Sequence, residues 1–129
     1  MIRRQKKFLK FYDYYPQAYF VAEINDEIVG YCLFRITPNI SVKGITKKAC
    51  LFSIAIHPDY RNKKIGTYLV ENSIKFLENC GITRIYLYVN IRNEAAIALY
   101  RRFGFKIVKF VMNMCGEGRE CYKMELKLK

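Results

Sequence analysis

The chain has 129 residues, of which 52% are hydrophobic, so it can bury the core of one domain but not of two. No stretch reaches the ~18 uninterrupted apolar residues of a membrane span, and no signal-peptide core follows the basic start, so we expect a cytoplasmic protein. The net charge of +12 attracts polyanions, and nucleic acid, acidic proteins and cofactor phosphates all stay open, as does a solvated surface without a specific partner.

The cysteines do not show the spacing of a metal site or of a disulfide framework. There are five of them, with no CxxC pair, and the chain has a single histidine. No metal is therefore expected. We interpret all five as reduced thiols in a reducing compartment: Cys32, Cys50, Cys80, Cys115 and Cys121.

The first segment, 3–16, is predicted to be an amphipathic helix ended by Pro16. Its apolar face would be formed by aromatic residues spaced three and four apart, which are Phe8, Phe11, Tyr12 and Tyr15. The opposite face is basic, and packing on a sheet is favoured over binding to membrane or RNA because the aromatic residues suit a core.

Strands are expected next. The runs 19–25 and 27–36 are rich in β-forming residues, and the turn-forming pair at 25–26 predicts an antiparallel hairpin. The segment Thr37–Lys47 contains Pro, Asn, Ser and Gly and is predicted to be a loop. The apolar run 48–56 is predicted to be a central strand.

The second half alternates helices and strands. A helix over 65–80 should end at Gly81, and a short Ala-rich helix over 93–103 should end at Gly104. Strands are predicted at 82–89, 105–114 and 119–129, with a glycine turn at 116–118 joining the last two. This pattern predicts a mixed sheet with helices on its faces.

A basic loop lies between the strand at 48–56 and the helix that follows it. Free N–H groups and the positive end of the helix dipole make a helix start an anion site. Arg61, Lys63 and Lys64 add charge, Gly66 lets a ligand approach the main chain, and Thr67 offers a hydroxyl. The loop therefore suits a pyrophosphate, with a solvated basic loop as the alternative.

Two spaced signatures give the chain its resemblance to the GNAT acetyltransferase family. The first, Arg or Gln, two residues, Gly, one residue, Gly or Ala, matches 61–66. The second, Asn-x-x-Ala-x-x-x-Tyr-x-x-x-Gly-Phe, is matched by Asn93, Ala96, Tyr100, Gly104 and Phe105. The likeness runs from about Pro16 to the C-terminus, and it implies an α/β (α+β) fold in which about six mostly antiparallel strands are flanked by about three helices.

Within this family, the phrases YPQAYFVAE, DEIVGY, SIAIHPDYR and GRECYKMEL are similar to stretches of N-terminal protein acetyltransferases, including the ribosomal-protein-alanine type. The resemblance implies acetyl-CoA as the acetyl donor. The backbone of Ile54, Ala55 and Ile56 would pair with the pantetheine arm, and Asn93 would bond the same arm. The pyrophosphate would lie on the loop formed by Arg61, Asn62, Lys63, Lys64, Ile65, Gly66 and Thr67.

The resemblance also implies direct attack of an amine on the thioester. The main-chain N–H near Ile56 would polarise the carbonyl, and Tyr100 would protonate the leaving thiolate. Many N-terminal acetyltransferases carry Glu or His where this chain has Tyr88, which with its ordinary pKa of about 10 is a poor base but can position a water. Glu23 is the second candidate base, with a surface strand residue as the alternative, and His57 is interpreted as a loop residue.

The sequence departs from the family in two further places. Lys64 fills the first glycine position of the cofactor signature, where it can add a phosphate contact. The chain also begins near the family's second helix, so the first strand, the first helix and the loop between the helices are expected to be missing or reduced. Three explanations stay open: a lost start, a partner that completes the site, or a minimal enzyme with an open acceptor groove.

We therefore expect a single acetyltransferase domain, 1–129, that acts on an amine, with a protein N-terminus favoured over polyamines, aminoglycosides or amino acids. A homodimer is compatible with this hypothesis, and the charge is compatible with ribosome or nucleic-acid contact. The hypothesis of another class is a basic nucleic-acid or ribosome-binding module without catalysis.

Overall fold

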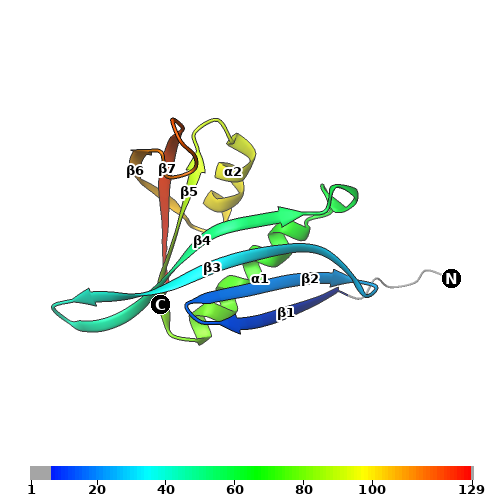
Figure 1. Ribbon diagram of the computed structural model, residues 1–129, viewed down its shortest axis with the longest axis horizontal. Coiled ribbons are helices and arrows are strands. Elements are labelled where there is room, and N and C mark those ends of the chain that lie inside the picture. Colours follow the sequence, from blue (N-terminus) through cyan, green and yellow to red (C-terminus); the bar gives the residue numbers. More distant parts are fainter. Residues whose placement is uncertain (1–6, 129) are drawn as a thin grey trace.

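A seven-stranded sheet dominates the computed structural model, which describes residues 7–128 (Figure 1). The strand order is β1-β2-β3-β4-β5-β7-β6, and every neighbouring pair is antiparallel except β4 and β5. In chain order the elements are β1 (Lys7–Tyr14), β2 (Gln17–Ile24), β3 (Glu27–Ser41), β4 (Gly44–Ile56), the 3-10 turn η1 (Pro58–Tyr60), α1 (Ile65–Asn79), β5 (Ile82–Asn90), α2 (Glu94–Arg102), β6 (Lys106–Met112) and β7 (Glu120–Lys127).

The expected fold class, a mixed and mostly antiparallel sheet with flanking helices, is confirmed. Within residues 7–128 the sheet has one strand more than expected, and there are two α-helices where about three were predicted. None of these helices is long and apolar enough to cross a membrane.

The helix predicted over 3–16 is wrong where the structure describes it, because Lys7–Tyr14 forms the edge strand β1. Residues 3–6 of that prediction lie outside the described residues. The three-and-four spacing of aromatic residues coexists with a period-two pattern, in which half-buried Leu9 and Phe11 alternate with exposed Lys10 and Tyr12. Pairing with β2 selects the second pattern, and Phe11 then packs its ring 4.3 Å from that of Phe76 in α1.

β1 also corrects the expectation that the front of the sheet lacks its first strand. Only Tyr15 and Pro16 stand between β1 and β2, so these two strands are joined by a turn rather than by helices. The whole of β1 pairs with β2, from Lys7 opposite Ile24 to Tyr14 opposite Gln17.

The loop predicted for Thr37–Lys47 is also wrong, because β3 and β4 continue through it as a two-stranded arm. Pairing extends to Ser41 opposite Gly44, and Figure 1 shows the arm projecting past the other strands at the left. The β-branched residues in this segment favour strand structure over the turn formers. Ile40 and Ile45 lie opposite each other on one side of the arm and are 78% and 75% exposed, and Thr46 on the other side is exposed as well. Both sides of the arm therefore meet solvent, which is why its composition resembles a loop.

The core lies between α1 and one face of the sheet. Phe20 of β2 and Phe34 of β3 are fully buried there, and the ring of Phe20 lies 5.5 Å from that of Phe76. Ser73 of α1 is buried too, with its hydroxyl donating to the carbonyl of Leu69 at 2.6 Å. These contacts fix α1 against the middle of the sheet, and with it the helix start that bears the basic loop.

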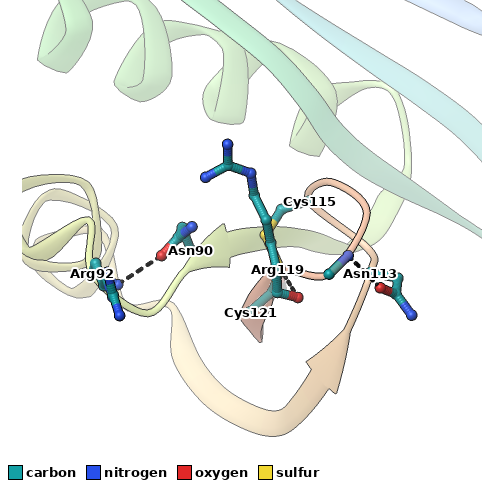
Figure 2. Close-up of a disulfide and its surroundings, with 7 residues drawn as sticks. Asn90, Arg92, Asn113, Cys115, Arg119 and Cys121 are labelled. Carbon is teal, nitrogen blue, oxygen red and sulfur yellow. Dashed lines mark hydrogen bonds between the residues drawn. A yellow bond between two sulfur atoms is a disulfide. The ribbon is translucent and has the colours of Figure 1, made fainter.

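The interpretation of all five cysteines as reduced thiols is wrong for one pair. Cys115 and Cys121 form a disulfide with their Cα atoms 6.3 Å apart, across the turn that joins β6 to β7 (Figure 2). The glycines at 116 and 118, both at positive φ, turn the chain back so that its two ends meet. The other three cysteines are free thiols, buried at Cys32, half-buried at Cys50 and exposed at Cys80.

Candidate functional site

The site begins where β4 and β5 separate. Their parallel pairing ends at Leu51 and Leu87, and a register shift in the β3–β4 pairing leaves Phe52 as an extra residue just beyond. Such a bulge increases the local twist of a strand. Residues Ile54–Ile56 therefore keep β3 on one side, at pairs such as Ile54 opposite Cys32, and no strand within residues 7–128 pairs with their other side.

The basic loop forms the second wall of the site. Asn62 and Lys64 both have positive φ, of 63° and 62°, and turns of this kind direct successive N–H groups toward one point. Lys64 is the N-cap of α1, but no side chain caps the helix and no acidic residue lies in its first turn. The N–H groups of the first turn are thus left for an anion, beside the positive end of the dipole.

α2 forms the third wall. Asn93 is its N-cap, and the side-chain oxygen of Asn93 accepts a hydrogen bond from the Ala96 N–H at 3.2 Å. Because that oxygen is occupied, the amide NH₂ of Asn93 is the part of this side chain left to donate to a ligand. Two helical turns after Asn93, Tyr100 is 6% exposed and packs edge-on against Phe105 with the ring centroids 5.7 Å apart.

Together these walls enclose a groove of about 890 Å³. It gathers nearly all of the residues expected to bind the cofactor, and Lys63 is the member of that set outside its lining. The lining residues expected from the sequence are Ile54, Ala55, Ile56, Arg61, Asn62, Lys64, Ile65, Gly66, Thr67, Asn93 and Tyr100. Lys63 instead lies over the ring of Tyr60, with its Nζ 5.3 Å from the centroid.

Sequence reasoning missed five residues that also line the groove: Tyr60, Ala95, Ala96, Leu99 and Arg102. Four of them belong to α2, and their helical spacing was the available signal, since residues three and four apart share a face. Ala96 was noted only as a signature match. Tyr60 carried no such signal, because its place depends on the η1 turn and on the hydrogen bond from its hydroxyl to Glu27 at 3.1 Å.

Burial raises the pKa of Tyr100 to about 12, and the nearby Cys32 acts in the same direction. A phenol in this position stays protonated at neutral pH and can donate a hydrogen bond into the groove. The groove thus joins an anion site at one end to a proton donor in its wall.

The two other catalytic candidates lie outside the groove. Tyr88 is half-buried on β5, on the opposite sheet face from α1, and its pKa is raised by burial, with smaller effects of Cys50 and Glu125. Glu23 lies on β2, two strands from the groove, where its carboxylate pairs with Lys10 at 3.1 Å. His57 lies in the loop before η1 and accepts from the Asp59 N–H.

A smaller hollow of about 270 Å³ lies beside the disulfide. Asn90, Ile91 and Arg92, after β5, form one side of it, and Gly118, Arg119 and Glu120 form the other. Figure 2 shows Asn90 and Arg92 on one side and the Arg119 side chain running past Cys115 on the other. The Asn90 side chain accepts from the Arg92 N–H at 2.9 Å, and that of Asn113 accepts from the Gly118 N–H at 2.7 Å. Both segments are therefore fixed locally.

A groove that pairs an open strand edge with an uncapped helix start and a buried tyrosine is typical of acetyl-CoA-dependent N-acetyltransferases. The family model described as "Acetyltransferase (GNAT) family" matches residues 2–105. The N-alpha-acetyltransferase of Sulfolobus acidocaldarius is 33% identical over 119 residues, which are 88% of this chain and 71% of that protein.

Solved structures agree with this comparison. The ribosomal-protein-S18-alanine N-acetyltransferase of Escherichia coli superimposes with a TM-score of 0.74 at 26% identity, over 91% of this chain and 72% of that one. Arabidopsis thaliana Naa50, solved with the bisubstrate analogue CoA-Ac-MVNAL, superimposes with a TM-score of 0.71 at 27% identity. The match covers 85% of this chain and 72% of that one. The chain belongs to the GNAT acetyltransferase family, and it is an N-acetyltransferase that uses acetyl-CoA.

Proposed function

We propose that this protein, as a single acetyltransferase domain, transfers the acetyl group of acetyl-CoA to the α-amine of a protein N-terminus. The observation that carries the proposal is the groove between β4, α1 and α2, because it gathers the two signatures in one place. The acceptor class is supported by relatives, since the Sulfolobus protein is named an N-alpha-acetyltransferase and the Arabidopsis structure contains a peptide-linked CoA analogue.

The donor would lie along the groove. An extended amide chain such as pantetheine can bind the open edge of Ile54–Ile56 as an added strand would. Its pyrophosphate would occupy the uncapped start of α1, with Arg61 and Lys64 supplying charge and Gly66 leaving room at the main chain. Arg102, in the last turn of α2, adds a cation on the facing wall of the same groove. Lys63, exposed beside Tyr60, can reach the phosphates only from outside the groove.

The chemistry is a direct transfer. The neutral amine attacks the thioester carbonyl, a C–N bond forms, the C–S bond breaks, and CoA leaves as a thiolate. The thiolate takes up a proton and the nitrogen, positively charged after the attack, releases one to water, so the products are the amide and the CoA thiol. The N–H near Ile56 would stabilise charge on the carbonyl oxygen, and Tyr100 would donate to the departing sulfur. Its pKa of about 12 is compatible with the donor role, because the phenol keeps its proton at neutral and mildly alkaline pH.

The amine must first lose a proton. We propose that Tyr88 does this work by holding a water rather than as a base, because its raised pKa makes the phenolate scarce at neutral pH. Glu23 is the competing candidate. It is less suited to the role because its carboxylate is in an ion pair with Lys10 and because β2 lies two strands away from β4 in the sheet. Comparing kcat/KM of Tyr88→Phe and Glu23→Gln separates them, since the working group is the one whose replacement lowers the rate.

The test of the acceptor class is an assay of CoA release with paired peptides. One peptide has a free N-terminus and an internal lysine, and its twin differs only by a blocked N-terminus. We expect acetylation of the first alone, placed at the α-amine by mass spectrometry. Equal turnover of both peptides, or turnover of spermidine but of neither peptide, would reject an N-terminal acceptor in favour of lysine or of a small amine.

A further inference from the structure

One face of the sheet is left bare by the helices of the described chain. α1 packs on the face that bears Phe20, and the buried Tyr100 of α2 lies on the same side, near Cys32. Figure 1 looks onto the sheet with α1 behind β2 and β3. On the opposite face, strand alternation and register place a group of tyrosines, here called the tyrosine face: Tyr12, Tyr14, Tyr19 and Tyr31.

The tyrosine face is aromatic and open. Tyr14 and Tyr31 are 65% and 39% exposed, and Tyr12 lies directly opposite Tyr19 across the β1–β2 pair. The rings of Tyr14 and Tyr19 meet edge to face with centroids 5.9 Å apart. A shallow hollow of about 490 Å³ lies among these residues, lined by Tyr12, Tyr14, Gln17, Tyr19 and Val21.

The charges on this face are mostly positive. Its carboxylates are already paired, Glu23 with Lys10 and Glu125 with both Arg84 and Lys123. Two further cations of the face, Arg35 and Lys48, pair with no carboxylate of residues 7–128.

Positive charge also lies beside the rings. Arg35 is opposite Gln17, next to the hollow, and the Lys48 ammonium lies 5.6 Å from the centroid of the Tyr86 ring. At the rim, the Lys47 ammonium lies 5.7 Å from the ring of Tyr15. Surfaces that bind single-stranded nucleic acid combine aromatic side chains, on which bases stack, with cations that contact the phosphates. The tyrosine face has both.

We infer that the tyrosine face binds single-stranded RNA, an activity beyond the proposed acetyl transfer. Bases stack on the rings around the hollow while Arg35 and Lys48 contact phosphates. A second copy of this chain is a poor occupant, because two proteins of net charge +12 repel each other. The Tyr19 hydroxyl already donates to the Gln17 Oε1 at 3.0 Å. The Gln17 NH₂ group and the hydroxyls of Tyr12 and Tyr14 are left to hydrogen-bond a ribose 2′-hydroxyl, so RNA is favoured over DNA.

The test uses the whole chain and short oligouridine at low salt. Because the chain has no tryptophan, stacking is expected to quench its tyrosine fluorescence directly. The double variant Tyr12→Leu, Tyr19→Leu should bind at least about tenfold more weakly, because it removes two aromatic rings on which bases would stack. Its acetyl transfer and melting temperature should match those of the unchanged chain.

Matched controls lie elsewhere on the sheet. Phe110→Leu removes an aromatic ring that is 53% exposed on β6, and Lys109→Gln removes an exposed cation beside it. Both should leave RNA binding intact. Arg35→Gln, in contrast, should make the slope of the logarithm of the binding constant against the logarithm of the salt concentration shallower by about 0.7. The inference would be overturned if the control variants lost as much RNA affinity as the tyrosine double variant, or if the chain bound the matching DNA as tightly as the RNA. Self-association that buries the tyrosines would overturn it as well.

The two proposals fail separately. Loss of RNA binding in the tyrosine double variant with unchanged turnover supports both an RNA surface and a distinct acetyl-transfer site. Absence of RNA binding by the unchanged chain, with normal turnover, rejects only the RNA surface. RNA binding without any turnover of a free N-terminus rejects only the proposed acceptor.

Discussion

Leu51 and Leu87 are the last residues at which β4 and β5 pair, and the groove that holds the two family signatures begins directly beyond them. Pairing up to this point fixes the strands, and their separation exposes the edge of Ile54–Ile56. A ligand bound there would contact elements with fixed positions, because β4 pairs with β3 along its length and α1 packs into the core. The predictions below test separate parts of this arrangement.

Gly66→Ala should separate ligand binding from stability. A methyl group at this position would meet nothing nearer than the Ile56 Cγ1, at 4.0 Å, so the fold tolerates it. Alanine also favours helix over glycine by up to ~1 kcal/mol, so the melting temperature should stay level or rise. The KM for acetyl-CoA should rise by about tenfold, because the methyl would stand where a phosphate needs the main chain.

The control for this prediction is Lys75→Ala, an exposed α1 position whose ammonium pairs with Glu71 at 3.4 Å. It should leave the KM for acetyl-CoA unchanged. A KM that is unaltered in Gly66→Ala as well would mean that the start of α1 does not contact the donor.

Tyr100→Phe should lower kcat by about a hundredfold, the lower end of what general acid catalysis contributes. The KM for acetyl-CoA should change little, since the ring and its packing on Phe105 are kept. Because the pKa of Tyr100 is about 12, its deprotonation should not reduce the wild-type rate between about pH 8 and 10. Steady-state rates across this range test both statements, and an undiminished kcat in the variant at every pH would remove Tyr100 from the mechanism.

The Cys115–Cys121 disulfide fixes the number of free thiols in the chain, which is easily measured. The denatured, unreduced chain should expose three thiols, Cys32, Cys50 and Cys80, and the reduced chain five. Opening so short a loop removes about 2 kcal/mol of stability in the chain-entropy account, so reductant should lower the melting temperature. The double variant Cys115→Ser, Cys121→Ser should no longer respond to reductant, and a response that persists would point to a different pairing.

The central half of the fold was predictable because its signals are local. The helix at 65–79 shows its period and its glycine stop, and the second signature placed Asn93 and Tyr100 on one helix face. The loop residues at 61–67 were expected to face a common point, and all of them except Lys63 line the groove.

The errors arose where distant partners decide the structure. Residues 7–14 carry a helical and a strand pattern at once, and only the neighbouring β2 selects the strand. The arm formed by β3 and β4 is exposed on both sides, so it lacks the alternation that marks a half-buried strand. The disulfide depends on how β6 and β7 meet, although cysteines flanking a glycine turn were a usable signal.

The alkaline stability of the protein should depend on the groups buried between α1, α2 and the sheet. Burial raises the pKa of Cys32 from 9.0 to about 12, and that of Tyr100 from 10.0 to about 12. The unfolded chain therefore releases these protons at lower pH than the folded chain. The stabilising effect of the neutral groups is complete below about pH 9 and is lost as the pH rises toward 12.

Denaturant unfolding at pH 8 and at pH 10 measures this loss. Cys32→Ala should reduce the difference in unfolding free energy between the two conditions, because one of the two buried acids is gone. Its matched control is Cys80→Ala, since Cys80 is exposed and no buried thiol is removed. This control should keep the full difference. If Cys32→Ala also shows the full difference in unfolding free energy between pH 8 and pH 10, the Cys32 thiol does not cause the alkaline loss of stability. Tyr100 is then the group to test next.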